Sequence, residues 1–580
     1  MRKILLTLLF VFVIAFPVYA LEVKDMKWGF DGKVITERVN VLSVLITNPT
    51  DMPFEGFISL YRADFLGRVI GVKSVQPCYI SPFSEKWVQF YIYLGFDAEN
   101  EKWAVIWGDG IRDSVTTPDV KFGPPARVFL YNSAEVLQTR ISMKMFSEDI
   151  FPTTVCATDG LYSVVLDHCP KWEPVRREAF MKWVYRGGVV HILHDSSGKY
   201  PKFTAELVEL NNPLEQFRIG SGIVTRHNIT HHKVSEALFE RMGFTAPVLN
   251  RSNTNYLYYN NIPQNFFSMM KNMVKPRYDW SLIGVMIFCY IVLICPVNFF
   301  LARRKGRRYW TATIFLLATV ITFSFILYFL GRRGYGEVSK IHTVSYARLI
   351  KNDLYDVTQY TNVFVTDGDY YTLTHSSPHN IYSLCEKEET INGIIVNGRD
   401  GYFKVDIPLY SSRAFIHTGE LKGDNIRLKV IKWNDKGIYP EIVLSAAGDF
   451  PDGILEAWLL YKNSIYQIGR NANEFKVIGE SAKNIESFIE SLEKYYYTYR
   501  NYPIASANKI YSAFANILIA RSVGGTSKMN YYLSLCDPSC LDRAQVFIYM
   551  RTPESFKLVR EGLGEEKGYV LYHQFIDKPE

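Results

Sequence analysis

The chain has 580 residues, of which 48% are hydrophobic, 15% aromatic and 21% charged, and its net charge is +7. This length exceeds what a single core usually serves, so we expect several domains, and the composition is too apolar for a disordered chain. Eight cysteines exclude a disulfide-dense scaffold. A small net charge spread along so long a chain is unlike the clustered basic face of a nucleic-acid-binding protein, so we expect no nucleic-acid partner.

Residues 1–20 have the pattern of a secretory signal peptide. Arg2 and Lys3 precede an apolar stretch from Ile4 to Ala15, and Val18-Tyr19-Ala20 suits a cleavage site. An uncleaved anchor remains the alternative. Both forms would start translocation, so the chain that follows is expected outside the cytoplasm.

Residues 21–120 are expected to form a β-sandwich. Short alternating runs such as Val39–Ile46, Gly56–Tyr61 and Trp87–Tyr93 are separated by turn-forming residues, for example Asn48–Asp51. Regular short strands of this kind are typical of sandwich modules.

Residues 121–275 change to an α/β pattern. Apolar runs at Arg127–Tyr131, Tyr162–Asp167 and Val189–Leu193 read as buried strands, and Glu173–Tyr185 reads as a helix before Gly187-Gly188. Strands that alternate with a helix predict a parallel sheet with βαβ topology.

In such a sheet, ligands bind at the carboxyl ends of the strands. We therefore predict a candidate ligand pocket from the polar residues that follow two of the strands: Asp167, His168, His194, Asp195 and Ser196. A serine nucleophile beside His194 is the catalytic alternative, which we do not favour because adjacency in sequence shows neither base nor orienting group. We assign no catalytic residue.

The sequence also raises the questions of a metal site and of disulfides. His227, His231 and His232 are interpreted as solvated loop residues, because no carboxylate or cysteine spacing supports a metal site. We expect no metal and no cofactor. Disulfides are open for two cysteine pairs: Cys156 with Cys169, and Cys536 with Cys540.

Residues 280–301 and 310–331 are each long and apolar enough to be transmembrane helices. The loop between them, 302–309, contains five basic residues, which should remain cytoplasmic and thereby set the topology: Arg303, Arg304, Lys305, Arg307 and Arg308. The two helices therefore form a hairpin with both long flanks on the opposite side. Pro296 interrupts the first span, which helix packing can tolerate.

Residues 335–480 are again rich in short strand patterns, such as Ile426–Ile431, and predict a β-sandwich region. Residues 481–580 are expected to contain a helical hairpin followed by terminal strands. The fold class is thus multidomain α/β plus all-β with membrane helices.

The α/β segment resembles class I glutamine amidotransferases in Tyr162–Asp167 and Phe180–Leu193, with Trp183 and Gly187-Gly188. The resemblance implies a flavodoxin- or amidotransferase-like α/β domain. Active members of that fold use a cysteine nucleophile. Here the run after Leu193 is HDSSG and holds no cysteine, so the resemblance implies a domain without catalytic function.

The whole layout resembles bacterial membrane proteins encoded near MoxR-type AAA ATPases. The specific match is the hairpin, with YIVLICPVNFFL at Tyr290–Leu301, the basic loop, and a second span that ends at Gly331. Phe299-Phe300 stands where a tyrosine is common, and further spans are lacking. The resemblance implies a cytoplasmic (inner) membrane location and envelope protein partners, one of them a MoxR-associated system, besides the lipid bilayer.

We therefore expect a non-catalytic, membrane-anchored envelope protein that acts in assembly, interaction or ligand sensing. The alternatives are an envelope hydrolase or transferase that uses the same strand ends, and a carbohydrate-binding sensor. Convergence of His191 or His194 with Asp167 and Ser196 within hydrogen-bonding reach would favour the enzyme.

Overall fold

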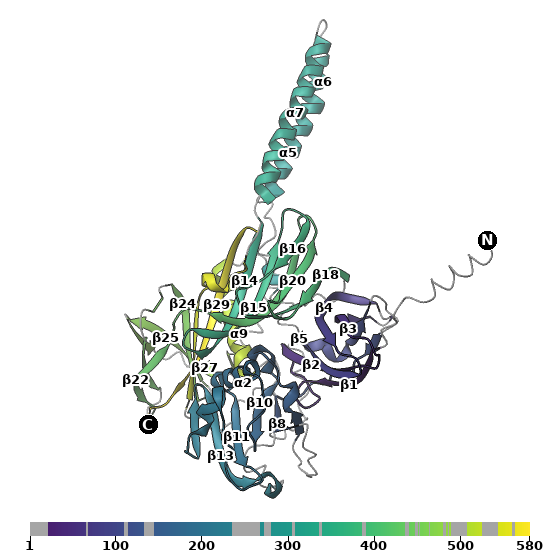
Figure 1. The fold of residues 1–580 in the computed structure, drawn as a ribbon. Helices are drawn as coiled ribbons and strands as arrows, with labels where there is room; N and C mark the ends of the chain where they lie inside the picture. The colour runs from purple at the N-terminus through teal and green to yellow at the C-terminus, as the bar shows by residue number, and fades with distance from the viewer. Residues whose placement is uncertain are drawn as a thin grey trace, which may run out of the picture.

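Figure 1 shows a body of packed sheets from which one helical hairpin projects. The computed structural model describes residues 21–64, 66, 68–108, 114–132, 144–234, 267–271, 280–303, 308–335, 339–384, 390–435, 440–446, 450–451, 453–462, 464–471, 473–478, 483–484, 487–488, 507–524, 543–559 and 563–579.

The N-terminal region contains two facing sheets. The smaller sheet is antiparallel, in the order β1 (Glu22–Trp28), β2 (Arg38–Asn48), β5 (Ser84–Leu94). The larger runs in the order β16 (Asp369–Leu373), β20 (Tyr402–Ile407), β18 (Thr390–Val396), β4 (Val69–Ile80), β3 (Phe54–Ala63), β6 (Lys102–Trp107), β7 (Ser114–Thr116). Leu42 and Phe90 from the small sheet and Leu60 from the large one share a fully buried core, which gives the predicted sandwich-like arrangement.

The next sheet is parallel apart from one edge strand, as its apolar strands predict. Its order is β12 (Gln216–Ile219), β13 (Gly222–Thr230), β11 (Val189–His194), β10 (Leu161–Leu166), β8 (Ala126–Tyr131), β9 (Lys144–Ser147). Helix α2 (Pro174–Arg186) connects β10 to β11, with Pro174 in its first turn and Gly187 at its end. A Cβ at Gly188 would lie 2.5 Å from the Trp183 ring, so only glycine allows this close packing.

The hairpin consists of α5 (Trp280–Val292), the π-helical turn η7 (Leu293–Val297), α6 (Asn298–Ala302) and α7 (Arg308–Tyr335). Its segments Ser281–Ala302 and Trp310–Phe329 are long and apolar enough to cross a membrane. Pro296 lies in the π-helical turn, which accommodates the missing N–H without ending the helix. Of the basic loop residues, Arg304, Lys305 and Arg307 lie outside the described residues.

The chain after the hairpin forms the largest sheet, with thirteen strands. Its order is β19 (Gly398–Arg399), β17 (His379–Leu384), β21 (Ser412–Lys422), β15 (Leu354–Phe364), β14 (Lys340–Lys351), β29 (Glu565–Asp577), β28 (Arg543–Arg551), β24 (Ile454–Tyr461), β25 (Ser464–Asn471), β26 (Glu474–Val477), β23 (Glu441–Ala446), β22 (Leu428–Asn434), and β27 (Lys483–Asn484) pairs with β25. Helix α9 (Ala507–Gly524) lies in the predicted helical region, whereas most of the first helix expected there falls outside the described residues.

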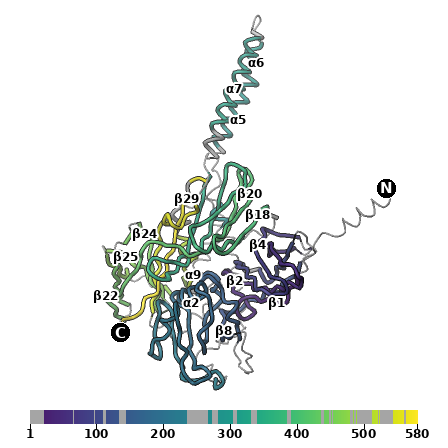
Figure 2. Tube along the Cα trace, in the orientation of Figure 1, coloured from purple at the N-terminus to yellow at the C-terminus, as the bar shows by residue number. Residues whose placement is uncertain are grey.

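Strands from both sides of the hairpin share sheets. β18 pairs in parallel with β4, from Thr390 opposite Gly71 to Val396 opposite Val75. The Cα trace in Figure 2 follows the same contact between the purple N-terminal and green C-terminal segments. The blocks 21–120 and 335–480 are therefore not separate modules in space, as the expected layout had them, because the edge of β4 is completed by a strand some 300 residues later in the chain.

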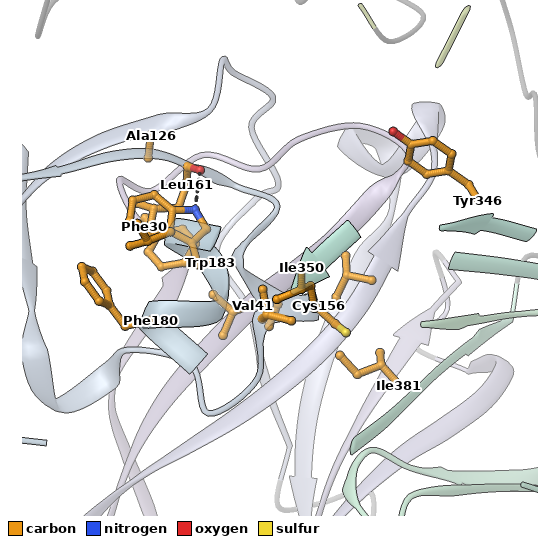
Figure 3. Close-up of a cluster of buried hydrophobic side chains, with 14 of the residues drawn as sticks. Phe30, Val41, Ala126, Cys156, Leu161, Phe180, Trp183, Tyr346, Ile350 and Ile381 are labelled. Carbon is orange, nitrogen blue, oxygen red and sulfur yellow. Dashed lines mark hydrogen bonds between the residues drawn. The ribbon is translucent and has the colours of Figure 1, made fainter. Parts of the chain in front are cut away.

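One hydrophobic core contains residues of the N-terminal sheets, of the α/β segment and of the large sheet that follows the hairpin. Figure 3 shows Val41 of β2, Trp183 of α2 and Ile350 of β14 within the same cluster, with Ile381 of β17 and Cys156 beside them. Trp183 Nε1 donates to the Leu161 carbonyl oxygen at 3.2 Å. This core fixes the α/β segment against the large sheet.

Beside this core lies a buried cluster of two arginines and two aspartates. Arg348 Nη2 lies 2.6 Å from Asp159 Oδ1 and also contacts Asp356, while Arg186 lies between the same two carboxylates. The Asp356 side chain is fully buried and that of Asp159 is 2% exposed. Burial alone would raise the pKa of Asp159, but the charges of Arg348 and Arg186 lower it to about 2. The cluster therefore stays ionised and connects α2 to β14 and β15.

Replacing Asp356 with alanine should destabilise the protein by about 3–5 kcal/mol, because two buried guanidinium groups lose a partner. The matched control is Glu441→Ala, which breaks the exposed pair with Lys432 and should cost less than about 1 kcal/mol. Denaturant unfolding of the purified full chain in detergent measures both. Equal losses for the two variants would contradict the role of the cluster.

The stability of the protein should also fall in mild acid. Burial lowers the pKa of His375 to about 3, and burial with nearby arginine charges lowers that of His573 to about 3. In the unfolded state these histidines take up protons near pH 6.5, whereas in the folded state they do not. Their contribution to the free energy of unfolding is therefore complete above about pH 6.5 and is lost as the pH falls. Unfolding free energies measured between pH 7 and 4.5 should drop by more than about 1.4 kcal/mol per pH unit. A flat profile over this range would contradict the prediction.

Candidate functional site

The order of the parallel strands identifies one position in the sheet where a ligand is expected. The chain runs from β8 outward to β9 and then returns across β8 to β10, so the direction of strand addition reverses between β8 and β10. In open α/β sheets, ligands bind outside the carboxyl ends of the strands at such a reversal.

Four side chains from this carboxyl edge form a chain of alternating carboxylates and imidazoles. Glu148 follows β9, Asp167 and His168 follow β10, and His231 follows β13. Glu148 Oε2 lies 3.1 Å from His168 Nε2, and His168 Nδ1 lies 2.8 Å from Asp167 Oδ1. Asp167 Oδ2 lies 2.7 Å from His231 Nδ1. We call these four residues the edge cluster.

Three members of the edge cluster are buried, and the fourth, His168, has a side chain that is 24% exposed. Glu148 is 3% exposed, His231 7% and Asp167 9%. Burial alone would lower the pKa of His168, but the hydrogen bonds and charges of Asp167 and Glu148 raise it to about 9. His168 is therefore a cation at neutral pH between two carboxylates.

His231 is the one member of the edge cluster with an open hydrogen-bonding position. Its Nδ1 is at ion-pair distance from Asp167, but the geometry makes no hydrogen bond. Its Nε2 is buried and has no hydrogen-bond partner among the described residues. The ring lies edge-on to Phe129 of β8 at 5.8 Å and against His232 at 3.8 Å. A buried polar atom without a partner costs free energy, so this nitrogen is the atom that a ligand would satisfy.

The structure separates the other predicted pocket residues from Asp167 and His168. Asp195 accepts hydrogen bonds from Ser197 Oγ at 2.6 Å and from the Lys199 amide at 3.0 Å, and so closes a turn after β11. His194 stands edge-on to Tyr200, and Ser196 is exposed. No hydrogen bond joins these residues to the edge cluster within the part of the chain that the structure describes.

The arrangement that would have favoured an enzyme is absent from the described residues. His191 Nδ1 lies 3.1 Å from His227 Nε2, not beside Asp167 or Ser196. Burial, with the positive charges of His227 and Arg127, lowers the pKa of His191 to about 3, and burial lowers that of His227 to about 4. Both rings are therefore uncharged at neutral pH, and one of the two facing nitrogens donates its N–H to the other.

Sequence reasoning placed Asp167 and His168 in this site but missed Glu148 and misjudged His231. Glu148 follows its strand directly, as Asp167 does, but the strand at 144–147 is too short to be recognised from the sequence. The interpretation of His231 as solvated is wrong, because the ring packs under the end of β13, whereas His232 is exposed. No group of metal-ligating side chains that could hold an ion occurs among the described residues.

The structure answers the question that the sequence left open for Cys156 and Cys169, because no disulfide joins them. Both thiols are free, and Cys156 lies fully buried in the core shown in Figure 3. Burial and the negative charges of Asp356 and Glu420 hold the pKa of the Cys156 thiol well above its usual range. Cys536 and Cys540 lie outside the described residues.

Comparison with known proteins adds little. No family model matches the chain, and no curated protein matches it. Solved structures match this chain at low similarity, among them three carbohydrate-active enzymes. A Paenibacillus sp. cycloisomaltooligosaccharide glucanotransferase is 9% identical over 69% of this chain and 72% of that one, with a TM-score of 0.16. The β-D-mannosidase of Dictyoglomus thermophilum is 9% identical over 81% and 76%, with a TM-score of 0.14.

The third structure is a β-glucuronidase of glycoside hydrolase family 2, which is 10% identical over 97% of this chain and 62% of that one, with a TM-score of 0.14. TM-scores this low carry no argument about fold or function.

The edge cluster predicts a specific pH dependence for His168→Gln. A histidine pKa raised to about 9 gives stabilisation that is complete below about pH 6.5 and is lost as the pH rises through 9. The variant should therefore be less stable than the parent by up to about 3 kcal/mol at pH 6 and nearly equal to it at pH 9.5.

Denaturant unfolding of both proteins at the two pH values provides the measurement, and His232→Gln, at an exposed ring, is the control. A difference that does not change with pH would show that His168 is not held as a cation.

Proposed function

We propose that the protein is a non-catalytic, membrane-anchored binding component whose ligand or partner is recognised at the edge cluster. The observation that carries this proposal is the chain of side chains from Glu148 to His231, which leaves the buried ring nitrogens of His231 without a hydrogen bond among the described residues, at the reversal of strand order. A site of this form binds through one imidazole nitrogen and holds that nitrogen rigidly.

The chemistry of the nearby groups supports binding over catalysis. Ser196 is exposed in the turn closed by Asp195, with no base among its described hydrogen-bond partners. The Cys156 thiol is buried away from the edge, and its raised pKa disfavours the thiolate that a nucleophile needs. This agrees with an amidotransferase-like domain that has lost its nucleophile, which is what the sequence resemblance implies.

The hairpin supports the membrane part of the proposal. Its apolar segments are exposed to the surroundings along their length, and a soluble protein would bury them. The basic loop between the two spans supports, by the positive-inside rule, a body on the extracytoplasmic side of the bacterial cytoplasmic membrane that the sequence resemblance implies. The partners that we propose are therefore envelope proteins, one of which, by the sequence resemblance, is a MoxR-associated system.

A photo-crosslinking residue at Ser196 in the full chain, expressed in its own membranes, tests the proposal. Ser196 is exposed beside the carboxyl edge, and Ile431 of β22, which is 56% exposed, is the control position. We expect a defined product from position 196, no such product from position 431, and loss of the product by at least tenfold in His231→Ala.

Two results would overturn the proposal. A product that His231→Ala leaves unchanged would mean that the edge cluster is not the binding site. Hydrolysis of an envelope glycan or peptide by the purified protein, abolished by Ser196→Ala, would mean that the protein is an enzyme.

A further inference from the structure

Several strands of the body end at the same edge, next to the hairpin. The register places Lys340 of β14 opposite Phe364 of β15 and Glu565 of β29, and Phe364 opposite Ser412 of β21. Figure 1 shows this edge, with the tip of β16 and β20, beside the base of the hairpin.

The chain between the hairpin and this edge is short. Helix α7 continues for six residues beyond Phe329, and β14 begins five residues after Tyr335. These segments span at most about 9 Å and about 17 Å, whereas a headgroup layer is roughly 5–8 Å thick. The edge therefore lies within about 25 Å of the hydrocarbon when the hairpin crosses a bilayer.

Two loops at this edge are locked together. The Val365 amide donates to the Ser411 carbonyl oxygen at 3.1 Å, and the Tyr371 hydroxyl donates to the Asp367 carbonyl oxygen at 2.7 Å. A Cβ at Gly368 would lie 2.8 Å from the Leu409 amide nitrogen, so the loops touch through their backbones. We call residues 366–370 and 408–411 the membrane-proximal tip.

The membrane-proximal tip displays large side chains to the outside. Tyr370 is 55% exposed, Leu409 58% and Tyr410 51%. Tyr410 has a φ of +52°, a conformation that bulky residues rarely adopt. Backbone strain of this kind is often found where a residue makes a functional contact, and the ring of Tyr410 is available for one.

We propose that Tyr370, Leu409 and Tyr410 lie in the headgroup layer of the bilayer that the hairpin crosses, and so fix the tilt of the body on the membrane. Tyrosine rings partition into this layer because their bodies are apolar and their hydroxyls are wet. Asp367 and Asp369 lie in the same tip, and Lys404 Nζ lies 5.9 Å from the centre of the Tyr370 ring. The tip therefore has no excess of positive charge to attract anionic lipid, and added salt should leave the contact unchanged.

This inference rests on the proposed membrane anchoring. A nitroxide attached at Leu409 through a genetically encoded residue, in the full chain in lipid vesicles, tests it. The collision rates of the nitroxide with oxygen, which concentrates in lipid, and with a water-soluble nickel chelate report its depth. Control labels stand at Leu214, 59% exposed in the α/β segment, and at Phe325, 63% exposed on the hairpin.

We expect the ratio of oxygen to nickel collisions at position 409 to exceed that at position 214 at least threefold, and to be the same in 0.05 M and 0.5 M salt. An equal ratio at 409 and 214, with a high ratio at 325, would overturn the lipid contact while leaving the anchor intact. A low ratio at 325 would overturn the anchor itself. Reduced collisions with both reagents at 409 would show that protein, not lipid, covers the tip.

Discussion

The arrangement of the body depends on the buried cluster of Arg186, Arg348, Asp159 and Asp356. Each arginine lies between both carboxylates, so no member can be removed without leaving an uncompensated charge in the core. Apolar packing around Trp183 and Ile350 would tolerate small shifts in angle between the α/β segment and the large sheet. Directional charge pairs do not, and they therefore define one docking geometry.

Helix α2 connects the ion cluster to the edge cluster. α2 ends at Arg186, inside the ion cluster, and begins at Pro174, just after the carboxyl end of β10 that carries Asp167 and His168. Lys182 of the same helix also pairs with the buried Glu420 at 2.7 Å. The helix is thus held against β14, β15 and β21, so the strand ends of the proposed binding site keep a fixed relation to the segment that follows the hairpin.

Local sequence signals predicted the local parts of this structure. The two apolar spans and the strands of the parallel sheet follow from length and periodicity, and Asp167 and His168 follow from their place after β10. Pairing between β4 and β18 could not be predicted, because parallel partners far apart in the chain leave no periodic signal in either strand. The burial of His231 could not be predicted for a related reason. A run of histidines in a loop gives no sign that one of them packs against the ring of Phe129, which comes from a distant strand.

The pairing of β4 with β18 has a consequence for biogenesis. β4 leaves the ribosome roughly 300 residues before its partner strand, which at about 5–20 residues per second takes on the order of 15 to 60 s. With the hairpin inserted as proposed, the N-terminal sandwich waits outside the membrane with an unpaired strand edge, which is a template for aggregation. A chain interrupted after the hairpin would keep the edge of β4 unpaired. That edge is a feature by which quality-control proteins on the same side of the membrane could distinguish incomplete chains from complete ones.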